Sequence, residues 1–125
     1  EPDRFRQSLS FLQPLPRPMQ VQLQAFSRKT ESLRQVIVND LADKGHDVLY
    51  VQEFKNVERK PGWAKIRGTG MPGAINIKWD ASSHMLTARV VTRGGNKPYQ
   101  LLGVFLEYVT ERHGRKISSI NIQLR

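Results

Sequence analysis

Apolar and polar residues alternate along several short stretches of this 125-residue chain, and this alternation constrains the fold more than any other feature. Between Met19 and Phe26, the residues Val21, Leu23 and Ala25 alternate with three glutamines. Because successive side chains of a strand point to opposite faces, the pattern predicts a strand with one buried face and one solvated face. A sheet of such strands needs a covering layer on one side only.

The same alternation recurs in three later segments, residues 63–67, 74–80 and 85–93. Apolar side chains occupy every second position there: Ala64 and Ile66, then Ile75, Ile77 and Trp79, then Leu86, Ala88 and Val90. Polar and basic residues fill most of the positions between them. We therefore predict three more strands that share one buried and one solvated face.

Two further segments are rich in residues that favour strands. Residues 47–55 read DVLYVQEFK and carry apolar groups on both faces, so we expect a central strand. Residues 117–124 alternate again, and we expect Ile120, Ile122 and Leu124 to face the core.

A helical period of apolar residues predicts a first helix near residues 30–44. Ser27 or Thr30 can cap its start, because a short polar side chain there accepts a hydrogen bond from a free backbone amide. Lys44 and Gly45 suit its end, as a cation in the last turn and a glycine beyond it.

A second helix is predicted between Pro98 and Gly114. Gly103 costs about 1 kcal/mol against alanine in a helix interior, so we expect it to permit close backbone packing. His113 in the last turn is expected to interact with the helix dipole. The apolar stripe of this helix comprises Leu101, Leu102, Phe105, Tyr108 and Val109.

The predicted order is β-α-β-β-β-β-α-β, which indicates an α+β domain. We expect a mainly antiparallel sheet with two helices packed on one face. The length suits one domain, which we place at residues 19–125. Residues 1–18 contain Pro14, Pro16 and Pro18, which deny hydrogen bonds to a sheet, so we expect a proline-rich N-terminal arm there.

The amino-acid composition excludes several kinds of functional site. The chain has no cysteine, which excludes disulfides, thiolate nucleophiles and cysteine-bound metals. We find neither a run of 18 apolar residues nor a signal-peptide pattern, and we expect a cytoplasmic protein. No nucleotide-binding glycine motif is present. The string from Gly70 to Gly73 joins two predicted strands and contains Pro72, so a turn is the better interpretation.

Catalytic and metal-binding groups are sparse. The three histidines, His46, His84 and His113, have no metal-ligand spacing and lie at the ends of predicted elements. Glu107 and Glu111 share one helix face and are interpreted as solvated surface. We expect no enzyme activity, no cofactor and no metal.

Positive charge is concentrated in the second half of the chain. The whole chain has 20 Lys and Arg against 11 Asp and Glu, a formal charge of +9. Residues 61–125 hold ten of these cations and only three acids, Asp80, Glu107 and Glu111. Like charges gathered without interleaved acids suggest an anionic partner, and nucleic acid is the commonest.

Strand parity indicates where this charge gathers. The cations of the predicted strands occupy positions opposite the apolar set, so we expect them on the open face of the sheet. Trp63 can stack on a base there, with Tyr50 or Phe54 as further rings. The candidate binding residues are Trp63, Lys65, Arg67, Lys78, Arg89, Arg93 and Lys97.

Cations beside an aromatic ring are typical of single-strand binding, in which bases stack on rings while phosphates contact Lys and Arg. The sequence therefore favours a non-catalytic domain that binds RNA or single-stranded DNA. A protein-interaction or assembly module is the alternative, with residues 1–18 or an exposed edge strand as the contact. No membrane partner is expected.

Overall fold

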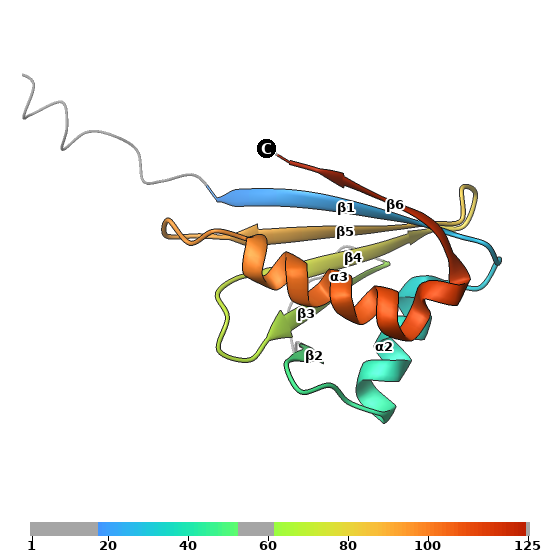
Figure 1. Ribbon diagram of the computed structural model, residues 1–125, viewed down its shortest axis with the longest axis horizontal. Coiled ribbons are helices and arrows are strands. Elements are labelled where there is room, and N and C mark those ends of the chain that lie inside the picture. The colour runs from blue at the N-terminus through green and yellow to red at the C-terminus, as the bar shows by residue number, and fades with distance from the viewer. Residues whose placement is uncertain (1–17, 53–61, 125) are drawn as a thin grey trace, which may run out of the picture.

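The computed structural model describes residues 18–52 and 62–124, and these form one antiparallel sheet covered by two helices (Figure 1). The strands are β1 (Met19–Ser27), β2 (Leu49–Val51), β3 (Trp63–Gly68), β4 (Ala74–Asp80), β5 (Met85–Thr92) and β6 (Ile117–Gln123). The helices are α2 (Leu33–Asp43), α3 (Tyr99–His113) and the short 3-10 helix η1 (Gly114–Lys116). The predicted class and element order are confirmed.

The sheet order is β2-β3-β4-β5-β1-β6, with antiparallel pairing throughout. The strands β2 to β5 follow one another as a meander. The first strand, β1, then lies between β5 and β6, so the first and last strands of the described chain are neighbours in the sheet (Figure 1). This leaves β2 and β6 as the edge strands.

Both helices cover the same face of the sheet, as predicted (Figure 1). The apolar side chains of the two helices pack into a single core with those of the sheet. This core includes Ile37 of α2 and Phe105 of α3, and Leu23, Ile77 and Ala88 of the strands. All five of these side chains are completely buried. The buried sheet positions alternate with exposed or half-exposed ones, and no helix or strand within residues 18–52 and 62–124 covers the opposite face, which we call the open face.

The prediction of a central strand at residues 47–55 is wrong. Among the described residues the strand is Leu49–Val51, and it lies at the edge of the sheet, where β3 is its one described neighbour; residues 53–55 of the predicted strand lie outside the described part of the chain. Leu49 faces the core, whereas Tyr50 is 46% exposed. Aromatic and β-branched residues favour any strand, so their presence on both faces did not distinguish an edge from a centre.

The start of α2 differs from the expectation. Its cap is Ser32, whose hydroxyl accepts a hydrogen bond from the backbone amide of Gln35 at 3.2 Å. Ser27 instead belongs to β1, and its hydroxyl bonds to the carbonyl of Lys116. The end is as predicted: Lys44 is the C-cap, and Gly45 follows with a φ of 73°.

Two glycines of α3 also differ from the expectation. A side chain at Gly103 would meet open space, so this residue is not a site of close packing. Gly114 has a φ of −58°, and the chain continues into η1 rather than turning left-handed. Pro98 is the N-cap and has no side-chain hydrogen bond, but its carbonyl accepts the amide of Leu102 at 3.0 Å.

The core contribution of β6 is smaller than predicted. Ile120 and Ile122 pair with core residues of β1 and are half-buried, as expected for the inward face of an edge strand. Leu124 lies beyond the strand and is 71% exposed, so it does not face the core.

A polar cluster joins α2 to the end of α3. Asp40 accepts a hydrogen bond from the Tyr108 hydroxyl at 2.7 Å and forms an ion pair with Arg112 at 3.0 Å. The His113 Nε2 lies 2.9 Å from the same hydroxyl. Since that hydroxyl donates to the carboxylate, its oxygen is left to accept from His113. Arg112 also donates to the carbonyl of Gly45 at 2.7 Å.

The expected dipole role of His113 is wrong, because this side chain is buried. Burial lowers the pKa of His113, so the ring is neutral at pH 7. Burial alone would raise the pKa of Asp40, but the hydrogen bonds from Tyr108 and Arg112 outweigh it and hold that pKa below its usual value. The cluster is therefore a carboxylate held by a tyrosine and an arginine, with a neutral histidine behind them.

Candidate nucleic-acid interface

Four of the predicted cations lie on the open face of β3, β4 and β5. Lys65 and Arg67 alternate with buried Ala64 and Ile66, and Arg89 stands between buried Ala88 and Val90. Lys78 follows buried Ile77 and is exposed. The pairing register then places Lys78 opposite Trp63, on the same face.

Trp63 lies within reach of two of these cations. The Lys78 Nζ is 5.8 Å from the centroid of the indole ring, and the Arg89 Cζ is 5.1 Å from it. At these distances the cations are attracted to the electron-rich ring face. Both cations thus lie beside the ring, although Arg89 belongs to β5, two strands away from it.

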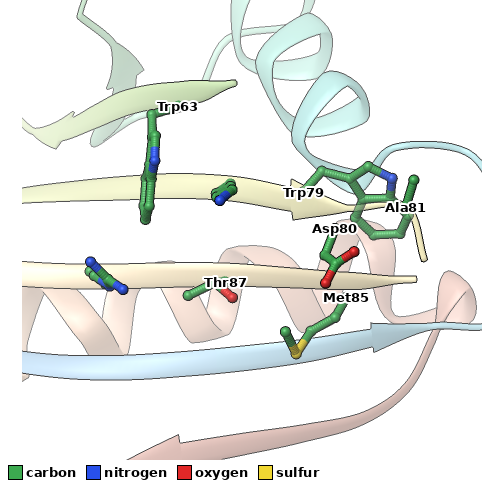
Figure 2. Close-up of a pocket in the computed structure, with 8 residues that line it drawn as sticks. Trp63, Trp79, Asp80, Ala81, Met85 and Thr87 are labelled. Carbon is green, nitrogen blue, oxygen red and sulfur yellow. The ribbon is translucent and has the colours of Figure 1, made fainter. Parts of the chain in front are cut away.

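A hollow of about 420 Å³ opens beside Trp63. Figure 2 shows Trp63 at one end, Thr87 along the middle, and Asp80 with Met85 at the other end. The full lining comprises Trp63, Lys78, Trp79, Asp80, Ala81, Met85, Thr87 and Arg89. The hollow therefore combines an aromatic wall, two cations and one acid.

Asp80 closes this hollow where the β4–β5 hairpin turns. Its Oδ1 accepts hydrogen bonds from the Ser82 amide at 3.0 Å and from the Ser82 hydroxyl at 2.7 Å. These hydrogen bonds from Ser82, together with hydrogen bonds from Ser83, lower the pKa of Asp80, so the carboxylate is ionised at pH 7. Trp79, at the same end, stacks on His84 with ring centroids 6.5 Å apart.

Arg67 has a structural role besides its charge. Its Nε donates to the side chain of Gln52, and its NH1 donates to the carbonyl of Gly73 at 3.1 Å. The guanidinium thus joins β3 to the start of β4 and to the residue that follows β2. Lys65 lies opposite Asn76 in the register and is half-buried.

The remaining candidates lie at the margins of this face. Tyr50 is exposed and pairs in register with Arg67, which gives a second ring beside the cations. Arg93 and Lys97 are exposed but lie in the loop between β5 and α3, beyond the strands. Phe54, the third predicted ring, lies outside the described residues.

The other half of the open face is rich in amides. Gln22 and Gln24 of β1 pair in register with Arg89 and Thr87 of β5. On the side of β1 that faces β6, the side-chain oxygen of Gln24 accepts a hydrogen bond from the side-chain amide of Asn121 at 3.2 Å. The open face therefore passes from a basic region on β3–β5 to a neutral, amide-bearing region on β1 and β6.

Sequence reasoning found the cations and Trp63 but missed the residues that complete the hollow. Thr87 and Asp80 could have been predicted on the open face, because each lies two residues from Arg89 or Lys78 in the same strand. The contact between Trp63 and Arg89 had no such signal, because it depends on the register of three strands.

Comparison of the chain with family models, with curated proteins and with solved structures gave no match. Within residues 18–52 and 62–124, no helix combines the length and apolarity needed to cross a membrane. In that same part of the chain, no three histidine or acidic side chains are grouped so that they could hold a metal ion. The functional assignment therefore depends on the open sheet face.

Proposed function

We propose that this protein is a non-catalytic domain that binds single-stranded nucleic acid, RNA or DNA, across the open face of its sheet. The observation that carries the proposal is the position of Trp63, an aromatic ring flanked by Lys78 and Arg89 at 5.8 and 5.1 Å. A base can stack on the ring while the flexible cations contact the adjoining phosphates.

The amide-bearing region on β1 and β6 suits a single nucleic-acid strand that continues across the sheet. Glutamine and asparagine side chains both donate and accept hydrogen bonds, so they can pair with exposed base edges. Gln24 and Asn121 lie in the same register row as Lys78 and Thr87. This arrangement favours unpaired bases lying flat on the sheet, with phosphates at the basic end.

Single strands fit this surface better than duplexes for a physical reason. An open sheet face that carries the Trp63 and Tyr50 rings offers stacking only to bases that are already unpaired. We also propose that the protein is cytoplasmic, where RNA is accessible. It requires no cofactor.

The direct test is fluorescence anisotropy with labelled mixed-sequence RNA, single-stranded DNA and duplex DNA, at about 50 mM and about 200 mM salt. The proposal predicts single-strand binding that weakens as salt increases. Binding weaker than about 100 μM for both single strands at low salt would refute it, since that is poorer than ordinary non-specific affinity.

A protein-assembly module is the second candidate, and the edge strand β6 favours it. Its sequence, ISSINIQ, has no charge and no proline, although such residues commonly protect a sheet edge. Leu124 beside it is 71% exposed. A partner strand added there would bind with little salt dependence, and the same titration separates the two candidates.

A further inference from the structure

We propose that Tyr50 and Arg67 form a second stacking subsite at the β2 edge of the open face, so that one nucleic-acid strand occupies this subsite and the Trp63 subsite together. This inference rests on the proposed single-strand binding and deepens it, because it states which ligands the face holds best: oligomers long enough to reach both rings. Binding at Trp63 alone would set no such length.

The same pair of side chains occurs twice on the open face: an aromatic ring with a cation directly opposite it on the neighbouring strand. Trp63 of β3 lies opposite Lys78 of β4, and Tyr50 of β2 lies opposite Arg67 of β3. Side chains at directly opposite positions of an antiparallel pair have Cβ atoms about 4.5–5.5 Å apart. A base stacked on either ring therefore has a cation within reach of its phosphate.

Tyr50 presents its ring to the open face. It lies between Leu49, which is buried, and Val51, which packs against the core, so the alternation of the strand places Tyr50 on the opposite side. At 46% exposure it is the most exposed aromatic side chain on the described strands. Because β2 lies at the edge beside β3 (Figure 1), a strand bound on β3 can reach this ring.

The guanidinium of Arg67 is oriented by neutral groups. Its Nε donates to the side chain of Gln52, and its NH1 donates to the carbonyl of Gly73 at 3.1 Å. Within residues 18–52 and 62–124, no acid forms an ion pair with it. These two hydrogen bonds use two of the five N–H donors of a guanidinium, which leaves donors and a full positive charge for a phosphate. An ordered side chain also loses less entropy on binding than a free one.

The separation of the two rings sets the length of the ligand. Trp63 and Arg67 are four residues apart on β3, and Tyr50 is one strand further, so the two rings rise from backbone positions about 14 Å apart. Neighbouring stacked bases of one strand are about 3.4 Å apart. A strand of about five stacked nucleotides therefore reaches from one ring to the other, whereas a dinucleotide contacts one ring at a time.

The experiment measures the affinity of a labelled uridine nonamer by fluorescence anisotropy. Tyr50→Ala and Trp63→Ala should each weaken binding roughly 5- to 150-fold, because each removes the stacking surface of one base. The double variant should lose about the product of the two single losses, since the rings hold different bases. Tyr50→Phe keeps the ring and should bind within about twofold of the wild type.

Tyr99→Ala is the matched control, because Tyr99 is 49% exposed, much like Tyr50, but begins α3 in the helix layer. It should leave the affinity within about twofold of the wild type. The salt dependence is a second readout. Tyr50→Ala should not change the slope of log affinity against log salt, because tyrosine carries no charge, whereas a disturbed β2 edge that displaces Arg67 would flatten the slope by about 0.7.

Ligand length gives an independent measurement. With unlabelled uridine oligomers of two to nine nucleotides as competitors, the wild-type affinity should increase in a step at about five nucleotides, and Tyr50→Ala should lack this step. A step that persists in Tyr50→Ala would overturn the inference.

The outcomes separate the two proposals. If Tyr50→Ala binds the nonamer as Tyr99→Ala does while Trp63→Ala weakens binding, this inference is wrong and the proposed function stands. If Tyr50→Phe is as weak as Tyr50→Ala, or if Tyr50→Ala flattens the salt slope, Tyr50 acts through the structure of the sheet edge, and the inference is again wrong. If the wild type does not bind the nonamer, both proposals fail.

Discussion

Removing one hydroxyl, by Tyr108→Phe, is expected to destabilise the fold far more than its size suggests. Tyr108 is 1% exposed, and its hydroxyl connects Asp40 at 2.7 Å with the His113 ring at 2.9 Å. Phenylalanine keeps the ring and its packing but deletes both contacts. Asp40 then depends on Arg112 alone, and the imidazole N–H loses its acceptor.

The magnitude follows from these two losses. A hydrogen bond to a charged group contributes about 1.5–3 kcal/mol, and a buried donor left without a partner costs about 1–3 kcal/mol. The two contacts share one oxygen and are not fully additive, so we expect a loss of about 2–4 kcal/mol in the free energy of unfolding. For a domain of this size that corresponds to a melting temperature lower by roughly 10–20 °C.

Urea unfolding at pH 7, followed by circular dichroism, measures this loss directly. The midpoint should fall without a change in slope, because the surface exposed on unfolding is the same. Tyr99→Phe is the control, since Tyr99 is 49% exposed and should change stability by less than about 0.5 kcal/mol. A Tyr108→Phe loss no larger than that of the control would refute the role assigned to the cluster.

Three further predictions concern stability. Gly73→Ala should cost at least about 2 kcal/mol, because φ is 99° and the new Cβ would lie 2.7 Å from the Val91 carbonyl oxygen; unchanged urea unfolding would contradict this. Gly103→Ala should add about 0.5–1 kcal/mol, since it meets open space in a helix interior, and a lower melting temperature would count against it. The lowered pKa of buried His113 means that the unfolded chain binds a proton more readily, so stability should be full above about pH 6.5 and decrease as pH falls below it. Urea unfolding across this range should show that decrease in the wild type and a weaker one in His113→Gln.

The sequence predicted the open face well because strand parity is a local property. A period of two decides which side of a strand is buried, so Lys78 and Arg89 could be assigned to the solvated face before any pairing was known. The helical period of apolar residues, which is also local, identified both helices, and the single buried face of the strands predicted their common layer. Leu124 was misplaced because parity alone does not show where a strand ends.

The remaining features depend on contacts between distant parts of the chain. The insertion of β1 between β5 and β6 is non-local, and so is the edge position of β2. Asp40 and Tyr108 are 68 residues apart, and neither position has a pattern that signals their hydrogen bond. The hollow beside Trp63 likewise exists only because the register of β3, β4 and β5 brings its walls together.

The most direct test of the account is the salt dependence of single-strand binding in the double variant Lys78→Gln/Arg89→Gln. If the four cations of the open face, with or without one of the loop cations Arg93 and Lys97, meet phosphates, the wild-type slope of log affinity against log salt should be about −3 to −4, from roughly 0.7 per contact. The double variant should flatten it by about one to one and a half units. Lys44→Gln/Arg115→Gln is the matched control, because it removes the same charges at exposed positions after α2 and in η1 and should leave the slope unchanged. Equal slopes for the two double variants, or a wild-type slope near zero, would contradict the assignment of the basic sheet face as the nucleic-acid interface.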